Sequence, residues 1–156
     1  MNRSFYFIIF LLSIGLLSCN GASEGNHGPG KKAKTEADSL MDRVMEGHDI
    51  GMAKMGKLTR AEQTTRRLLD SISQLPEKAR RSAEPLRARL DSLQKELSYA
   101  EMAMNKWMDE FNMDSAIHEA KARIEYLKNE ELKVDKVKEA ILGSLQKADS
   151  VLKEKF

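Results

Sequence analysis

From Glu36 to the end of the chain, apolar residues recur at alternating steps of three and four positions. Such spacing places them on one face of an α-helix, and where it is sustained it resembles the heptads of a coiled coil. The pattern therefore predicts an all-α fold of long amphipathic helices. Its members are Met41, Val44, Met45, His48, Met52, Met55, Leu58, Leu68, Leu69 and Ile72, then Leu86, Leu90, Leu93, Leu97, Ala100, Met104, Met108 and Phe111, and finally Ile117, Ala120, Ile124, Leu127, Val134, Val137, Ile141, Leu145, Ala148 and Leu152.

Two interruptions divide this pattern into three predicted helices. Pro76 disfavours helical geometry in the residue before it, whereas Pro85 is compatible with a first helical turn. A second break falls near residue 112, with Asp114 or Ser115 as the candidate N-cap of the third helix. We expect helices over about 36–74, 83–111 and 115–154, joined by short connections that make neighbours antiparallel. Residues 36–156 are thus predicted to form an elongated antiparallel three-helix bundle or coiled coil. The alternative is an extended helical hairpin that pairs with other chains.

A short apolar run precedes the predicted bundle. The thirteen residues from Phe5 to Leu17 are too few to span a membrane but are typical of a cleaved secretory signal. They end in Leu-Leu-Ser-Cys, which resembles the lipobox of bacterial lipoproteins. We therefore predict a signal peptide over 1–18, a lipid-modified Cys19, and a flexible linker over the rest of 19–35. Acyl chains such as palmitate would anchor the protein to a membrane. Under the enterobacterial sorting pattern, an aspartate after the lipidated cysteine retains a lipoprotein in the inner membrane. Residue 20 is asparagine, which favours the outer membrane, with the protein facing the periplasm or exposed at the surface.

The composition disfavours catalysis and nucleic-acid binding. Cys19 is the only cysteine, so its acylation leaves no thiol for a disulfide, a nucleophile or a metal site. The sequence contains no HExxH, GxSxG or P-loop motif, and we predict a protein that is not an enzyme. Aromatic residues make up 6% of the chain and do not interleave with the arginines, which disfavours nucleic acid as a partner.

Methionine and histidine gather at the predicted end of the bundle where the first helix begins. Folding the second helix back near residue 78 brings their two clusters together, and thioether and imidazole ligands suit Cu(I). A copper site is therefore one hypothesis, with His48, Met52, Met55, Met104 and Met108 as its ligands. The alternatives are that the methionines pack a core and no cofactor binds, or that this end holds a hydrophobic ligand or a haem-like cofactor.

Three glycines also fall in this part of the first predicted helix. Gly47, Gly51 and Gly56 each weaken a helix by about 1 kcal/mol relative to alanine. The predicted pairing places Trp107 opposite Gly51, where the indole would pack against the glycine.

Arginines gather at the other predicted end. The candidate residues for an anionic partner are Arg66, Arg67, Arg80, Arg81 and Arg87. Guanidinium groups pair well with carboxylate and phosphate, which predicts contact with peptidoglycan, with lipid A phosphates or with an acidic protein. The alternative is a solvated surface without a partner.

Two segments carry a resemblance to a known family. The segments HDIGMAKMGKL (48–58) and MNKWMDEF (104–111) resemble two motifs of a family of small helical lipoproteins from Bacteroidota, which is often labelled viral A-type inclusion protein. Gly51 departs from the family pattern, which usually has a larger apolar residue there. The resemblance implies an envelope lipoprotein and no particular mechanism.

The sequence therefore predicts a non-enzymatic cell-envelope lipoprotein, tethered to the membrane, whose helical module interacts with an envelope polymer, a protein or a second copy of itself. The alternative is a periplasmic Cu(I)-binding module.

Overall fold

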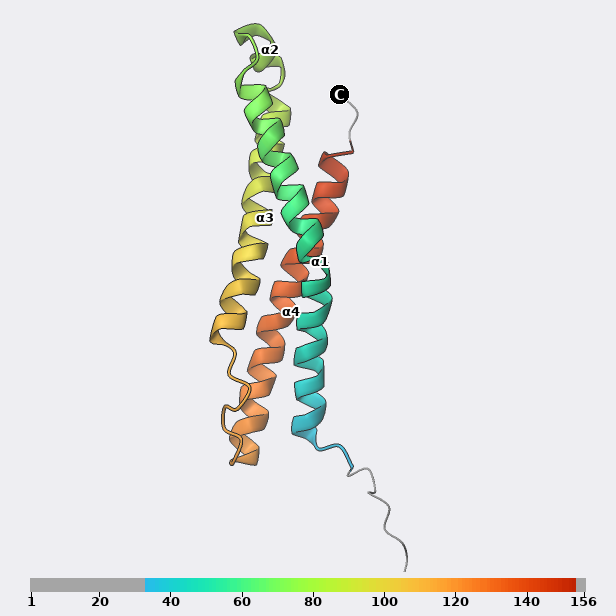
Figure 1. Cartoon of the computed structure of the whole chain (residues 1–156), viewed down its shortest axis with the longest axis vertical. Coiled ribbons are helices and arrows are strands. Elements are labelled where there is room, and N and C mark those ends of the chain that lie inside the picture. The colour runs from blue at the N-terminus through green and yellow to red at the C-terminus, as the bar shows by residue number, and fades with distance from the viewer. Residues whose placement is uncertain (1–32, 154–156) are drawn as a thin grey trace, which may run out of the picture. The chain divides into compact units, whose positions relative to one another are not determined.

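The computed structural model describes residues 33–153, and this part of the chain is all-helical, without a β-strand. It contains α1 (Glu36–Ser73), α2 (Glu77–Ser82), α3 (Glu84–Glu110) and α4 (Ala120–Val151) (Figure 1). The predicted all-α helical bundle is confirmed. The predicted signal peptide, Cys19 and most of the predicted linker, residues 1–32, lie outside the described residues.

The three long helices pack in an up-down-up arrangement. Helix α3 runs antiparallel to α1, and α4 returns alongside both, so that α1 and α4 are parallel (Figure 1). Each long helix contacts the other two. The core between them is mostly leucine and β-branched side chains that are fully buried: Leu40, Val44, Leu58, Leu90, Leu93, Leu97, Leu127, Val134 and Ile141.

Helix α1 begins at a capping box. The Thr35 side chain accepts a hydrogen bond from the Asp38 backbone N–H at 3.1 Å, and the Thr35 backbone N–H donates to the Asp38 carboxylate at 3.0 Å. Both bonds satisfy backbone donors that a helix start leaves without partners. The backbone and hydroxyl hydrogen bonds from Thr35 also lower the pKa of Asp38. These contacts fix the start of the first helix at its predicted position.

The predicted turn after the first helix contains an additional short helix. Helix α1 ends at the C-cap Gln74, close to the expected residue, because Pro76 follows. Pro76 is then the N-cap of α2, and Ala83, with φ −86° and ψ −2°, joins α2 to α3 without leaving the helical region. A connection of near-helical backbone therefore replaces the open turn that we expected.

Helix α4 begins at Ala120 instead of the predicted residue 115, and neither Asp114 nor Ser115 is its N-cap. The Asn112 side chain accepts from the Asp114 backbone N–H at 3.0 Å, a local bond that competes with helix formation. Two side chains of α4 hold this connection: the Tyr126 hydroxyl accepts from the Asn112 N–H at 2.7 Å, and Arg123 donates to the Ser115 carbonyl at 2.8 Å. Ala116 lies in the left-handed region with φ 53°.

The α1–α3 hairpin extends past the last turn of α4. That last turn lies beside the middle of α1, where Lys57 Nζ is 2.9 Å from Asp149 Oδ2 and where Thr64 shares a surface hollow with Leu152. Beyond this level the described chain continues as two packed helices joined through α2 (Figure 1). We call residues 66–91 the arm. Ile72 and Leu90 are buried within it.

Candidate functional site

The five predicted anion-binding arginines all lie on the arm. They come from three elements: α1 carries Arg66 and Arg67, α2 carries Arg80 and Arg81, and α3 carries Arg87. Their side chains point to solvent, with exposed fractions of 63% for Arg66, 78% for Arg81 and 49% for Arg87. The arm holds seven basic and four acidic residues, so it carries a net positive charge. We refer to these five residues as the arginine patch.

The hairpin brings two members of the arginine patch to one hollow. Arg80 and Arg87 line a depression of about 390 Å³ between α1, α2 and α3, together with Leu69, Asp70, Ser73 and Asp91. The arginines are neighbours here only because α2 folds back over the end of α1. The carboxylates of Asp70 and Asp91 line the same hollow, and Arg87 Nε lies 3.9 Å from Asp91 Oδ2.

Each member of the arginine patch also has a contact within the chain. The carboxylate partners are Glu62 for Arg66 at 2.7 Å, Glu77 for Arg81, and Glu84 for Arg87 at 3.6 Å. Arg67 donates to the Thr64 hydroxyl at 3.0 Å, and Arg80 donates to the Ser73 carbonyl at 3.4 Å. The pairs of Arg81 and Arg87 are exposed on both sides and contribute about 0 to 1 kcal/mol, so a ligand with several anionic groups can compete with them, whereas Glu62, the partner of Arg66, is buried.

The candidate copper ligands are divided between the core and the surface. Met104 is fully buried and Met55 is partly buried against the core. By contrast, 39% of Met52 and 37% of Met108 are exposed. His48 Nδ1 lies 2.9 Å from Asp49 Oδ1 on its own helix. The burial of Met104 is what the packing interpretation expects, and the Cu(I) hypothesis stays a prediction.

Gly51 is packed against a different residue from the one we predicted. A Cβ atom at Gly51 would lie 2.4 Å from Met104 Cε and 3.3 Å from Ile141 Cδ1. Met104 therefore occupies the space assigned to Trp107, three positions along α3. The reason lies in the Trp107 side chain, whose Nε1–H donates a hydrogen bond to Glu130 Oε2 on α4 at 3.0 Å. A buried indole N–H needs such an acceptor, and Gly51 offers none.

Trp107 is also the centre of a cluster of rings that the sequence did not predict. Its ring centroid lies 5.6 Å from that of His48 on α1 and 4.8 Å from that of Phe111. Phe111 in turn stacks on Tyr126 of α4 at 6.2 Å. Trp107 and Phe111 are four residues apart on one helix face, which was a usable signal. The cluster joins the three long helices at the end remote from the arm.

A group of polar side chains, one buried and three partly buried, crosses from α1 to α3 near the base of the arm. Glu62 is 6% exposed, and its Oε1 atom accepts from Arg66 at 2.7 Å, from Gln94 at 2.8 Å and from the Ser98 hydroxyl. A second carboxyl group, that of Glu101, lies three positions after Ser98 on α3, and Glu101 and Glu62 shift each other's pKa. We call Glu62, Gln94, Ser98 and Glu101 the polar layer. The sequence signal for it was slight: Glu62 follows the core residue Leu58 by four positions and therefore shares its face.

The two carboxyl groups of the polar layer have pKa values shifted in opposite directions. Burial, followed by the hydrogen bond to Glu62 and the charge of Glu62, raises the pKa of Glu101. Burial also acts to raise the pKa of Glu62, but the hydrogen bonds from Ser98 and Arg66 and the Arg66 charge outweigh it and lower that pKa. Glu101 is therefore the member of the pair that holds a proton more readily.

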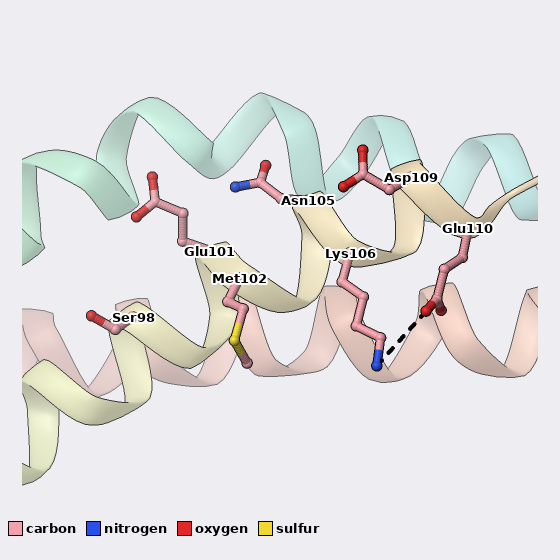
Figure 2. A pocket seen from close by; sticks show the side chains of 7 residues that line it. All are labelled: Ser98, Glu101, Met102, Asn105, Lys106, Asp109 and Glu110. Carbon is pink, nitrogen blue, oxygen red and sulfur yellow. Dashed lines mark ion pairs between the residues drawn. The ribbon is translucent and has the colours of Figure 1, made fainter.

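A shallow hollow of about 520 Å³ runs along α3 beside the polar layer. Its lining comes from α3 alone: Ser98, Glu101, Met102, Asn105, Lys106, Asp109 and Glu110 (Figure 2). In Figure 2, Glu101, Asn105 and Asp109 point toward α1, while Lys106 pairs with Glu110 at 3.8 Å on the other side. The hollow is open to solvent and gives water access to Glu101.

Residues 33–153 contain no group of three or more His, Cys, Asp or Glu side chains placed to hold a metal ion. None of the helices described is long and apolar enough to cross a membrane. Comparisons with protein-family models, with curated proteins and with solved structures found no match.

Proposed function

We propose that this protein is a non-enzymatic lipoprotein of the bacterial cell envelope, tethered through Cys19, whose arm binds an anionic component of the envelope. The observation that carries the proposal is the arginine patch. Its five members come from three helices, are exposed, and lie on the part of the bundle that, among the described residues, α1, α2 and α3 build. The lipobox and the resemblance to Bacteroidota lipoproteins support the tether.

The direction of the chain supports a tether before α1 and binding by the arm. The segment that follows Cys19 enters the bundle at Glu36, and α2 lies at the opposite end of α1 (Figure 1). With 38 residues and a rise of 1.5 Å per residue, α1 is about 57 Å long. A lipid anchor before α1 would thus leave the arginine patch free to reach a component some distance from the membrane surface.

The chemistry of the arginine patch points to an acidic polymer. Guanidinium groups bind carboxylates through paired hydrogen bonds, and several weak contacts along a polymer reinforce one another. Peptidoglycan presents many carboxylates within the envelope and is the partner we test.

The arm is expected to bind peptidoglycan through its charge. Full chain in detergent should co-sediment with purified sacculi, and the triple variant Arg80→Gln, Arg81→Gln and Arg87→Gln should lower the bound fraction at least about fivefold. Added salt should release the wild-type protein, because screening weakens exposed charge contacts.

The matched control for this experiment removes equal charge from the bundle outside the arm. The variant Lys54→Gln, Lys106→Gln and Lys121→Gln should bind as the wild type does. If wild-type protein stays in the supernatant, or if both triple variants lose binding equally, the assignment of the arm as the binding element is wrong.

Cys19 is expected to carry fatty acyl chains in a bacterial host. Radiolabelled palmitate should enter the wild-type protein and the Ser18→Ala variant, which keeps the thiol and a small residue before it, but not Cys19→Ala. Gel fluorography measures the label, and membrane fractionation should show Cys19→Ala released from the membrane. Absence of label from the wild type would show that the tether is wrong, whatever the outcome with sacculi.

A further inference from the structure

A small hollow lies where the last turns of α4 pack against the middle of α1, beside the base of the arm (Figure 1). It measures about 180 Å³, less than half the volume of the hollow that Arg80 and Arg87 share. Its lining includes three exposed cations, Lys57, Arg60 and Lys153, and we call it the seam hollow. None of the three belongs to the arginine patch.

A single carboxylate of the seam hollow faces these three cations. Asp149 Oδ2 lies 2.9 Å from Lys57 Nζ, and this hydrogen bond, followed by the charge of Lys153, lowers the pKa of Asp149 against the opposing effect of burial. The last carbonyl groups of α4 add a partial negative charge of about half a unit. The seam hollow therefore keeps a net positive charge.

Arg60 is the cation with the least compensation. Side chains three or four positions apart are neighbours on a helix, and the four such neighbours of Arg60 on α1 include no acid: Gly56, Lys57, Gln63 and Thr64. A Cβ atom at Gly56 would lie 3.5 Å from Arg60 Nη1, so the guanidinium group lies along α1 beside this glycine. Within residues 33–153 this guanidinium group has no ion pair.

The floor of the seam hollow is apolar. It is lined by Ala61 on α1 and by Ala148 and Leu152 on α4. Ala148 is buried, and the other two are partly buried against the core. A small inorganic anion would contact the cations and leave this floor uncovered. A carboxylate that carries a small apolar group can contact both, and the chain end of a peptide with a small last residue has this chemistry.

We propose that the seam hollow binds the chain-terminal carboxylate of a peptide whose last residue is small and apolar. Arg60 and Lys153 contact the carboxylate, and the alanine methyl groups of the floor contact the side chain. Two sources in the envelope share this chemistry: the D-alanine end of a peptidoglycan stem peptide and the L-residue end of a protein. The inference deepens the proposed function, on which the choice of a D-alanine probe rests, but the seam hollow lies outside the arm.

Nuclear magnetic resonance of the full chain in detergent, with isotopically labelled alanine methyl groups, tests this assignment. N-acetyl-D-Ala-D-Ala should move the signals of Ala61 and Ala148 until they saturate, with a dissociation constant of about 1 mM, as a few exposed contacts allow. Arg60→Gln should raise that constant at least about fivefold, because it removes the cation that has no partner. Asp149→Asn removes the competing carboxylate and should lower the constant. The same peptide with a terminal amide should leave both signals in place.

The matched control is Lys54→Gln, which removes one positive charge from an exposed position of α1 outside the seam hollow and should bind the peptide as the wild type does. Tighter binding of the D-peptide than of N-acetyl-L-Ala-L-Ala supports the site with a stem peptide as its ligand, and the reverse order supports it with a protein chain end. The assignment is wrong if neither peptide moves the two signals, if the amide binds as tightly as the acid, or if Arg60→Gln binds as the wild type does. Sacculus binding is measured with variants of the arm, so either result can fail while the other holds.

Discussion

Replacing Gly51 with leucine is expected to lower the free energy of unfolding by about 3 kcal/mol, the upper part of the usual range for an overfilled core. A Cβ atom at this position would lie 2.4 Å from Met104 Cε and 3.3 Å from Ile141 Cδ1. Both neighbours are fully buried. The Met104 methyl group can move aside for one added carbon, but three further carbons need space that the buried side chains of α3 and α4 already fill.

Gly143→Leu is the matched control for this substitution. Gly143 also lies inside a long helix, but a Cβ there meets nothing within 4 Å. Leucine forms helix better than glycine does, so this variant should be stabilised by up to about 1 kcal/mol. Urea unfolding of the full chain, followed by circular dichroism, measures both variants. Equal midpoints for the two would show that Gly51 is not a close packing point.

Replacing Glu130 with alanine is expected to lower the free energy of unfolding by about 3 kcal/mol. Glu130 is 3% exposed and Trp107 is 5% exposed, and the 3.0 Å bond between them joins α4 to α3. The substitution leaves the buried indole N–H without an acceptor and opens a space beside the ring cluster. The substitution also removes the 2.7 Å contact between Lys133 Nζ and Glu130 Oε1. The hydrogen bond to Glu130 raises the pKa of Lys133 in the wild type.

Two further variants isolate the cause. Glu130→Gln keeps an oxygen for Trp107 and should lose clearly less stability than Glu130→Ala. Glu139→Ala removes an exposed carboxylate from the same helix and should change the unfolding free energy by no more than about 0.5 kcal/mol. The same urea unfolding assay applies, with tryptophan fluorescence as a second signal. A Glu130→Ala variant as stable as Glu139→Ala would contradict a role for the buried acceptor.

The fold class and two of the helix ends were predictable because their causes are local. The spacing of Leu90, Leu93 and Leu97 defines a helix face without reference to any other segment. Pro76 ends α1 through its own ring, and the start at Glu36 is set by Thr35 and Asp38 within one turn. The start of α4 was missed because it depends on Tyr126 and Arg123, which hold the preceding connection from one to two turns further along the chain.

The candidate site was predictable only in part. Arginines at a helical hairpin are exposed almost by default, so their position on the arm could be read from the chain. Their convergence on one hollow could not, since α2 brings Arg80 near Arg87 by a fold in the connection that we did not expect. The polar layer was missed because Glu62 looks like any charged residue until Ser98 and Gln94, more than thirty positions away, are placed beside it.

Local features of the chain were sufficient for the helices, their antiparallel order and the surface charge of the arm. Residues three or four positions apart define each helix face, and short connections make neighbouring helices antiparallel. The tertiary structure decided which side chains meet: Met104 with Gly51, Trp107 with Glu130, and Glu62 with Ser98. The physical reason is that a heptad pattern identifies the inner face of a helix but leaves its partner position free to shift by a turn. That shift is settled by the demands of individual side chains, here the indole N–H that needs an acceptor and the glycine that leaves room for a methionine.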